Sequence, residues 1–98
     1  MTLKATTMEE IIRRVNIHDN ENEYRYYLIR RKSDNVCSFR LPLYSIRIEF
    51  EASSGKTSQH ELTNVFANED KANSFFNRLV ENLATPLNLP YVFEDEMS

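Results

Sequence analysis

The sequence is short of cysteine, of long apolar runs and of leader-like composition, and each shortage excludes a class of protein. Its single cysteine, Cys37, cannot form an intramolecular disulfide bond. The longest apolar stretch, at residues 26–29, is far shorter than the roughly twenty residues that a membrane-spanning helix needs. No signal-type run of basic, apolar and small residues opens the chain. We therefore expect a cytoplasmic protein with no membrane segment.

The chain has only one glycine and few residues of the types that build catalytic or metal sites. Residues 55–57 match the end of a phosphate-binding loop, but Phe50 occupies the position of its first glycine, and we expect a strand afterwards instead of a helix. His18, His60 and Cys37 lack the spacing of zinc ligands. No nucleophile, base and orienting group can be assembled from the available side chains. We therefore predict a protein that is not an enzyme and that uses no metal or cofactor.

The net charge is small but unevenly distributed. Twelve basic and 15 acidic residues give a charge of -3 over 98 residues, a length that predicts one domain, 1–98. A dedicated nucleic-acid-binding domain would carry a basic surplus. Residues 1–48 hold nine basic and six acidic residues (+3), whereas residues 49–98 hold three and nine (-6). The two halves could attract each other within one copy or between two copies.

Residues 1–22 predict a short N-terminal helix followed by a linker. Thr7 and Glu10 have the spacing of a capping box. Apolar residues then follow at helical spacing, namely Met8, Ile11, Ile12 and Val15. Residues 18–22 are polar and predict the linker. So short a helix needs an apolar cover, which either its own domain or another chain would supply.

Residues 23–67 predict antiparallel strands. Residues 24–31 are rich in aromatic and β-branched side chains, which favour a strand. Residues 44–67 read as a hairpin, with alternating apolar residues before a polar loop and a short strand, 61–67, after it. The loop holds Gly55.

The strand pattern changes phase near Pro42. Apolar side chains alternate at odd positions over residues 36–41 and at even positions over residues 44–50. Because a slip of one residue turns every side chain to the other face, this change predicts a bulge or a break. Residues 36–52 therefore form either one kinked strand or two strands.

Residues 68–84 predict an amphipathic helix, and residues 85–98 predict a tail. Asn68 is a good N-cap, and Thr85-Pro86 would end the helix. The apolar stripe of the helix consists of Ala72, Phe75, Phe76, Leu79, Val80 and Leu83. The predicted fold is α+β, a small antiparallel meander of three to four strands packed on one amphipathic C-terminal helix, with a short N-terminal helix.

More apolar groups are present than one helix can cover, and such a surplus often marks a binding surface. We therefore predict a non-enzymatic protein-protein interaction or regulatory module. Its partner would be another protein or a second copy of the chain, giving a homo-oligomer. The predicted partner-binding residues are Met8, Ile11, Ile12, Val15, Tyr24 and Tyr26.

The less favoured alternative is a small nucleic-acid-associated regulator. Cations interleave with aromatic residues at 24–32, a combination that can neutralise phosphates and stack bases. The candidate nucleic-acid-binding residues are Arg25, Arg30, Arg31 and Lys32. Alternation along a strand would leave no more than half of the aromatic side chains on one face.

Three segments follow one another in a characteristic order. They are residues 24–29 (Tyr-Arg-Tyr-Tyr-Leu-Ile), residues 44–49 (Tyr-Ser-Ile-Arg-Ile-Glu), and Thr85-Pro86 followed by Leu89, Val92, Glu94 and Asp95. This order resembles a family of short, uncharacterised bacterial proteins of clostridial and related Gram-positive lineages, classified as a domain of unknown function. The likeness covers residues 24–95 and departs at Ser45, where a glycine is expected. The resemblance implies a small cytoplasmic protein and carries over no activity, cofactor or catalytic residue.

Overall fold

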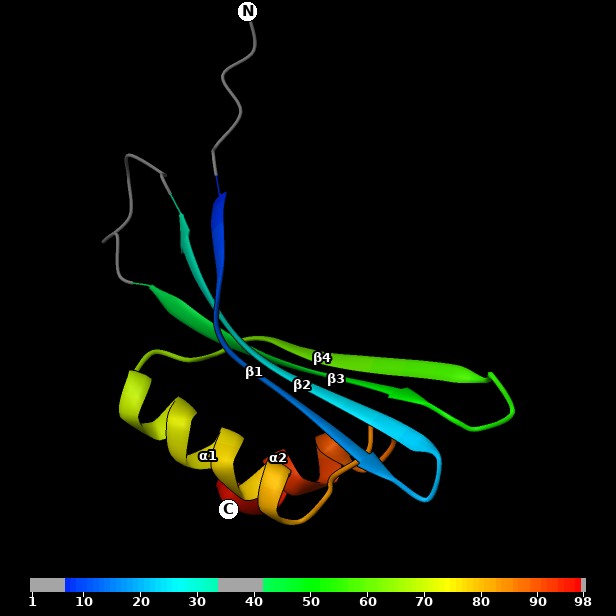
Figure 1. Ribbon diagram of the computed structural model, residues 1–98. Helices are drawn as coiled ribbons and strands as arrows, with labels where there is room; N and C mark the ends of the chain where they lie inside the picture. Colours follow the sequence, from blue (N-terminus) through cyan, green and yellow to red (C-terminus); the bar gives the residue numbers. More distant parts are fainter. Residues whose placement is uncertain (1–6, 34–41, 98) are drawn as a thin grey trace, which may run out of the picture.

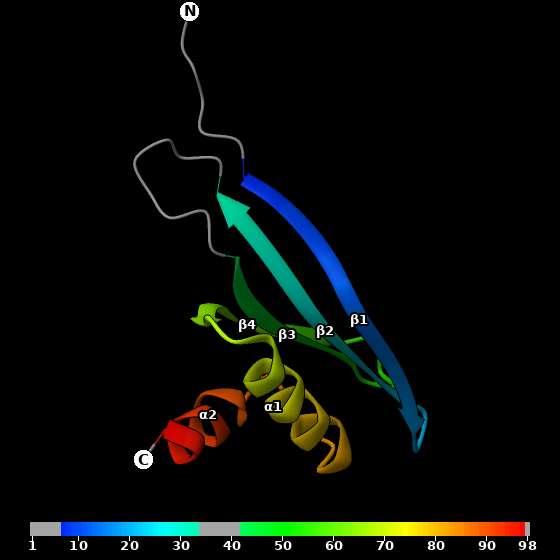
Figure 2. The same ribbon diagram turned by 90° about the vertical axis from the view of Figure 1, so that its left-hand side faces the viewer.

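The protein has two layers, a sheet and a pair of helices (Figure 1). The computed structural model describes residues 7–33 and 42–97. Its elements are β1 (Thr7–Asp19), β2 (Asn22–Ser33), β3 (Leu43–Glu51), β4 (Thr57–Phe66), α1 (Glu69–Glu81) and α2 (Leu89–Met97). The strands form an antiparallel sheet in the order β1-β2-β3-β4, and both helices lie on one of its faces (Figure 2). The predicted α+β class is confirmed.

The strands expected at residues 24–31, 44–50 and 61–67 are confirmed as β2, β3 and β4. β4 begins earlier than expected, at Thr57, so the hairpin loop is shorter. Its closing bond runs from the Ala52 amide to the Lys56 carbonyl (2.8 Å). The expected alternation over residues 36–41 lies outside the described residues, as does Cys37.

The N-terminal segment is a strand, so the prediction of a short helix within residues 1–22 is wrong. β1 pairs with β2 along its whole length, and the pairing shifts between Ile11 and Arg13. Ile12 is therefore the extra residue of a β-bulge. In a regular strand, residues three apart lie on opposite faces. The bulge lets Ile12 and Val15 both pack against the core, and their spacing therefore matches that of a helix.

Residues 18–22 are part of a hairpin and not the predicted linker. Asp19 pairs with Asn22, and the two residues between them, Asn20 and Glu21, have positive φ angles of 50° and 67°. Two consecutive left-handed residues are typical of a type I′ turn, which suits the twist of the strands that it joins.

Both edge strands are irregular in the same row of the sheet. Ile29 of β2 pairs with Ser45 of β3 in this row. The β1 bulge lies beside Ile29, and β4 places three residues opposite Ser45 alone, with Asn64 at a φ of 55°. Bulges bend and twist strands, and Figure 1 shows that the strands of the sheet are curved. Ile29 and Ser45 are fully buried although α1 and α2 both lie on the other face of the sheet.

Helix α1 occupies most of the predicted segment 68–84, and its N-cap is confirmed. The Asn68 side chain accepts a hydrogen bond from the Lys71 amide (3.0 Å). The helix ends at Glu81, before the predicted stop, because Leu83 takes a left-handed φ of 51°. The Ala84 and Leu83 amides then bond the carbonyls of Leu79 (3.0 Å) and Val80 (3.2 Å), which forms a Schellman cap.

The predicted tail, residues 85–98, contains helix α2 and is therefore not merely extended. Thr85 and Asn88 exchange hydrogen bonds between backbone amides and side-chain oxygens (2.8 and 3.4 Å) just before the helix. Pro90 lies in its first turn, where the missing amide has no intrahelical partner to lose.

The core lies between the sheet and the helices. Its largest fully buried members are aromatic and aliphatic side chains from both layers, namely Tyr26, Leu28, Ile46, Ile48, Phe75, Phe76, Leu79 and Leu89. Phe93 of α2 meets Phe66 of β4 and Phe75 of α1 edge-on, with ring centroids 5.8 Å apart in each pair. These contacts place α2 on the β4 side of the helical layer.

Candidate functional site

The N-terminal apolar residues predicted to bind a partner lie on both faces of β1. Ile12 and Val15 are half-buried and pack against the core, so they stabilise the protein's own fold. Ile11 pairs with Ile29 on the helix-free face and is 49% exposed. The side chain of Met8 lies outside the described part of the structure.

Tyr24 and Tyr26 lie in the core and present no surface to a partner. Tyr24 is 8% exposed and Tyr26 is fully buried. The Tyr26 hydroxyl donates to the carbonyl oxygen of Ala84, in the loop after α1 (2.8 Å). Burial, followed by the nearby Tyr24, raises the pKa of Tyr26.

The cations predicted to bind nucleic acid are divided between the two faces of β2. By alternation, Arg25 and Arg31 point away from the helices, whereas Arg30 and Lys32 point toward the helical side. Arg30 pairs with Glu10, and both arginines of the opposite face also pair with glutamates. Because Tyr24 and Tyr26 are buried on the helical side, the structure does not bring these aromatic rings and the cations together as one exposed strip.

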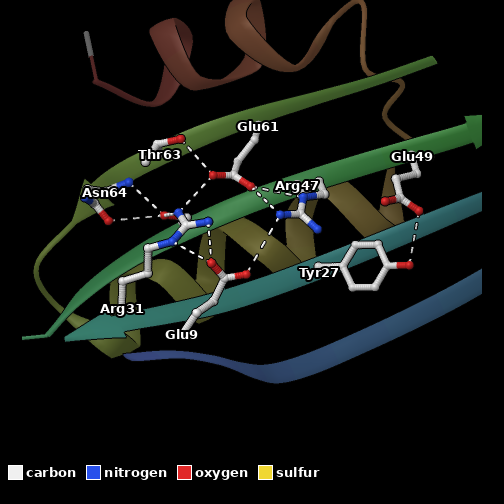
Figure 3. Close-up of polar contacts among 9 residues, drawn as sticks. Glu9, Tyr27, Arg31, Arg47, Glu49, Glu61, Thr63 and Asn64 are labelled. Carbon is white, nitrogen blue, oxygen red and sulfur yellow. Dashed lines mark hydrogen bonds and ion pairs between the residues drawn. The ribbon is translucent and has the colours of Figure 1, made fainter. Parts of the chain in front are cut away.

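The helix-free face of the sheet carries a network of arginines and glutamates instead (Figure 3). Arg31 contacts Glu61 (2.8 Å) and Glu9 (2.9 Å), and Arg47 contacts Glu61 through two nitrogens (2.9 and 3.0 Å). The side chains of Arg31 and Glu61 are only 16% and 20% exposed. We call this group, Glu9, Arg31, Arg47 and Glu61, the ion-pair cluster.

Ser45 joins the ion-pair cluster to the irregular part of β4. Its hydroxyl oxygen accepts hydrogen bonds from Arg31 (2.8 Å) and from the Asn64 backbone amide (2.8 Å). The amide of the left-handed residue is thereby satisfied, so the irregularity of β4 and the cluster support each other.

The ion-pair cluster shifts the titration of its central carboxylate. Burial alone would raise the pKa of Glu61, but hydrogen bonds from Arg31, Thr63 and Arg47 lower it from 4.5 to about 2. The carboxylate therefore stays ionised well into the acidic range and keeps both guanidinium groups in place.

A second group of charges lies further along the same face. Arg25 contacts Glu49 (2.9 Å), Glu23 (3.3 Å) and Glu51 (3.7 Å). The Tyr27 hydroxyl donates to Glu49 (3.2 Å), and burial, followed by this carboxylate, raises the pKa of Tyr27. Both of the predicted nucleic-acid cations on this face are therefore already matched by carboxylates.

The outer edge of β4 differs from the ion-paired face in its residue types. Thr57, Ser58, Gln59 and His60 are all exposed, and none of them is Lys, Arg, Asp or Glu. The next residue, Glu61, turns its charge inward to the ion-pair cluster. We call the open side of residues 57–63 the β4 edge. A shallow hollow of about 480 Å³ is lined by residues 57–59 together with Arg25 and Glu49 of the neighbouring strands.

The opposite edge strand, β1, carries charged side chains and is bonded to α1. Its bulge interrupts the strand, and Arg13 reaches across to α1. The Arg13 guanidinium donates to Asn73 (3.1 Å) and Asn77 (2.7 Å) and lies 4.5 Å from the centroid of the Phe76 ring. Charges and bulges are the usual protection of an edge strand, and β1 has both.

Two classes of site find no support in the described residues. Within residues 7–33 and 42–97, no three His, Cys, Asp or Glu side chains are grouped to hold a metal ion. Neither helix in these ranges combines the length and the apolar character needed to cross a membrane.

These features define a small two-layer α+β protein with one ion-paired sheet face and one edge, on β4, whose exposed residues 57–60 include no Lys, Arg, Asp or Glu. The chain belongs to a family of unknown function (DUF6514), which matches residues 6–98. No curated protein matches the chain, and no solved structure matches it.

Sequence reasoning missed both the ion-pair cluster and the β4 edge. Residues 57–60 are polar and adjoin Gly55, so they read as loop although Thr57 begins a strand. The signal that could have revealed the charged face is alternation: Arg47, Glu49 and Glu51 alternate with apolar residues on β3, and Arg25 and Arg31, six residues apart, share one face of β2.

Proposed function

We propose that this protein is a non-enzymatic protein-interaction module that binds an extended segment of another polypeptide along the β4 edge. The observation that carries the proposal is the uncharged and exposed run Thr57–His60 on an edge strand. An edge strand offers unpaired amides and carbonyls, and proteins normally protect it with charges, prolines or bulges. Residues 57–60 of β4 have no Lys, Arg, Asp, Glu, proline or bulge, and the first charge of the strand, on Glu61, is paired with Arg31 and Arg47, whereas β1 has both charges and a bulge.

The backbone phase of β4 favours strand pairing. Hydrogen-bonded and non-hydrogen-bonded pairs alternate in an antiparallel ladder, and Ala52 and Lys56 close the hairpin with a hydrogen bond. The amides and carbonyls of Thr57, Gln59 and Glu61 therefore point away from β3. A strand laid along this edge would meet a regular series of donors and acceptors.

The alternative function, nucleic-acid binding by the predicted cations, has weaker support. Arg25, Arg30 and Arg31 each have glutamate partners, so a phosphate would have to displace a carboxylate at each position. Salt-sensitive binding of single-stranded RNA that is lost in an Arg30→Ala/Arg31→Ala variant would favour this alternative.

A pair of proline variants tests the proposal. Gln59 and Asn16 lie in one row of the sheet, joined through Arg25 and Glu49, and stand on opposite edges. Both amides point outward by the phase of their hairpins, so proline at either position spares the internal ladder. The probe is a random peptide library displayed on phage and selected against the wild-type protein.

We expect selected peptides to shift the NMR signals of β4 amides and to lose binding to Gln59→Pro while still binding Asn16→Pro. Equal binding to both variants would place the contact elsewhere. Failure to select any peptide against a protein that sedimentation shows to be monomeric would contradict the strand-pairing proposal.

A further inference from the structure

We infer that the strand that pairs with the β4 edge is β4 of a second copy, so that two sheets join into one about a two-fold axis that passes between the two His60 residues. This inference rests on the proposed function and names its partner. It follows from the order of residues along the edge, from the charges there and from the position of the helices.

The residues of the β4 edge suit pairing with themselves. In an antiparallel register centred on His60, each Gln59 lies opposite the Glu61 of the other copy, and each Thr57 lies opposite a Thr63. An amide can donate to the carboxylate, and threonine pairs are favourable cross-strand neighbours. A register centred on Glu61 would instead place two carboxylates opposite each other.

The backbone phase agrees with the register centred on His60. Gln59 and Glu61 both hold their amides and carbonyls outward, so they can form a hydrogen-bonded pair between copies. Each His60 then sits in a non-hydrogen-bonded pair, with Cα atoms about 4.5 Å apart. One self-complementary strand serves both copies, as a two-fold dimer requires.

The charges near the β4 edge do not oppose this pairing. Each copy carries a net charge of -3, yet residues 57–60 hold no acidic or lysine or arginine side chain. The one carboxylate in the register, that of Glu61, is already matched by Arg31 and Arg47 within its own copy. These side chains therefore add little repulsion between two copies along this edge.

The helices leave this part of the edge open. Ser58 and His60 face the helical side of the sheet and are nevertheless exposed, so no helix covers them. Figure 1 shows the β3–β4 hairpin loop at the end of the sheet away from α1. A two-fold axis perpendicular to the joined sheet would place both helical layers on the same side of it.

Sedimentation equilibrium across micromolar concentrations gives the first test, with wild type, Gln59→Pro and Asn16→Pro compared at equal concentration. We expect a dimer for wild type and for Asn16→Pro. Gln59→Pro should weaken association by more than about tenfold, because a two-fold interface loses the same hydrogen bond twice. Circular dichroism checks that each variant is folded.

Disulfide trapping gives the second test, which does not depend on proline. In a Cys37→Ser background, His60→Cys should form an intermolecular disulfide under mild oxidation, since its Cα separation suits that bond. Ser58→Cys is the matched control on the same face of the same strand, and it should not crosslink because it faces Leu62 of the other copy.

The outcomes separate this inference from the proposed function. A chain that stays monomeric, with no His60→Cys crosslink, overturns the second copy as partner, while peptide binding that is lost in Gln59→Pro would still support strand pairing. A dimer that persists in Gln59→Pro and crosslinks equally at both cysteines also overturns the inference, because the contact then lies away from the β4 edge.

Discussion

The two faces of the sheet are built from the same strands, yet they are stabilised by different interactions. On the helical face, even-numbered residues of β2 and β3 such as Leu28 and Ile46 are buried against α1 and α2. On the other face, odd-numbered residues such as Arg31 and Arg47 meet glutamates, and no helix covers them. Apolar burial on the first face is non-directional, whereas the ion pairs on the second require defined geometry.

This difference shows how ion pairs can stabilise a sheet face on which neither α1 nor α2 packs. Ile29 and Tyr27 are buried on this face, and the Arg47 guanidinium lies over the Tyr27 ring, 5.8 Å from its centroid. The two faces should therefore respond differently to substitution, to acid and to salt. Four predictions test this contrast, beginning with the largest effect.

Removing an aromatic ring from the helical face should have the largest effect. Phe76→Ala should lower the free energy of unfolding by about 3 to 5 kcal/mol, because Phe76 is fully buried in the core. Urea denaturation measures this change, and Glu81→Ala, on the exposed side of α1, is the control. A loss no greater than that of the control would mean that the helical face is not the main source of stability.

The ion-paired face should be the acid-sensitive one. The folded pKa of Glu61 is about 2, lower than 4.5, so its contribution is complete above pH 4.5 and is lost as the pH falls toward 2. Glu61→Gln should cost on the order of 2 kcal/mol at neutral pH.

Urea denaturation of wild type and Glu61→Gln at neutral pH and at about pH 3 measures this linkage. The difference between the two proteins should shrink in acid, since the wild-type carboxylate begins to take up a proton as the protein unfolds. A difference that is the same at both pH values would contradict the role given to the ion-pair cluster.

Tyr26 and Tyr27 lie on opposite faces of the sheet, so removing each hydroxyl compares the contribution of one hydrogen bond on each face. Tyr26→Phe should cost about 1 to 2 kcal/mol, because it leaves the buried carbonyl of Ala84 without its hydroxyl donor. Tyr27→Phe should cost less than about 1 kcal/mol, since Glu49 keeps its bond to Arg25. Thermal unfolding of both variants ranks the effects, and the opposite order would refute this account of the two hydroxyls.

The smallest effect is expected for an exposed ion pair in the helical layer. Arg78 pairs with Glu96 between α1 and α2, and its side chain is 56% exposed. Arg78→Ala should change the free energy of unfolding by less than about 1 kcal/mol. Arg31→Ala, at 16% exposure, should cost more in the same denaturation experiment. Equal costs would show that burial does not distinguish the two pairs.

Elements with unbroken periodicity were predictable from the sequence. β2 and β3 follow from alternation and from β-branched and aromatic residues, and α1 follows from its apolar stripe and the Asn68 cap. Each of these patterns reports a local geometry in which side chains repeat every two or every 3.6 residues.

Elements whose pattern is interrupted were misread. The β1 bulge at Ile12 places apolar residues at helical spacing, and Pro90 suggests a break where it only begins α2. In both cases the deciding partner lies outside the segment itself, namely β2 for the strand and the core residues Phe66 and Phe75 for the helix.

The sequence by itself therefore determined the α+β class, the central strands and the covering helix, because periodic apolar residues specify which face of an element is buried. Only the tertiary structure decided which charges meet and which edge stays open. Arg31, Ser45 and Glu61 come from three different strands, and their contact depends on the register of those strands and on the irregularity at Asn64. Register concerns how one strand is aligned with the next, so the alternation of side chains within a single strand does not contain it.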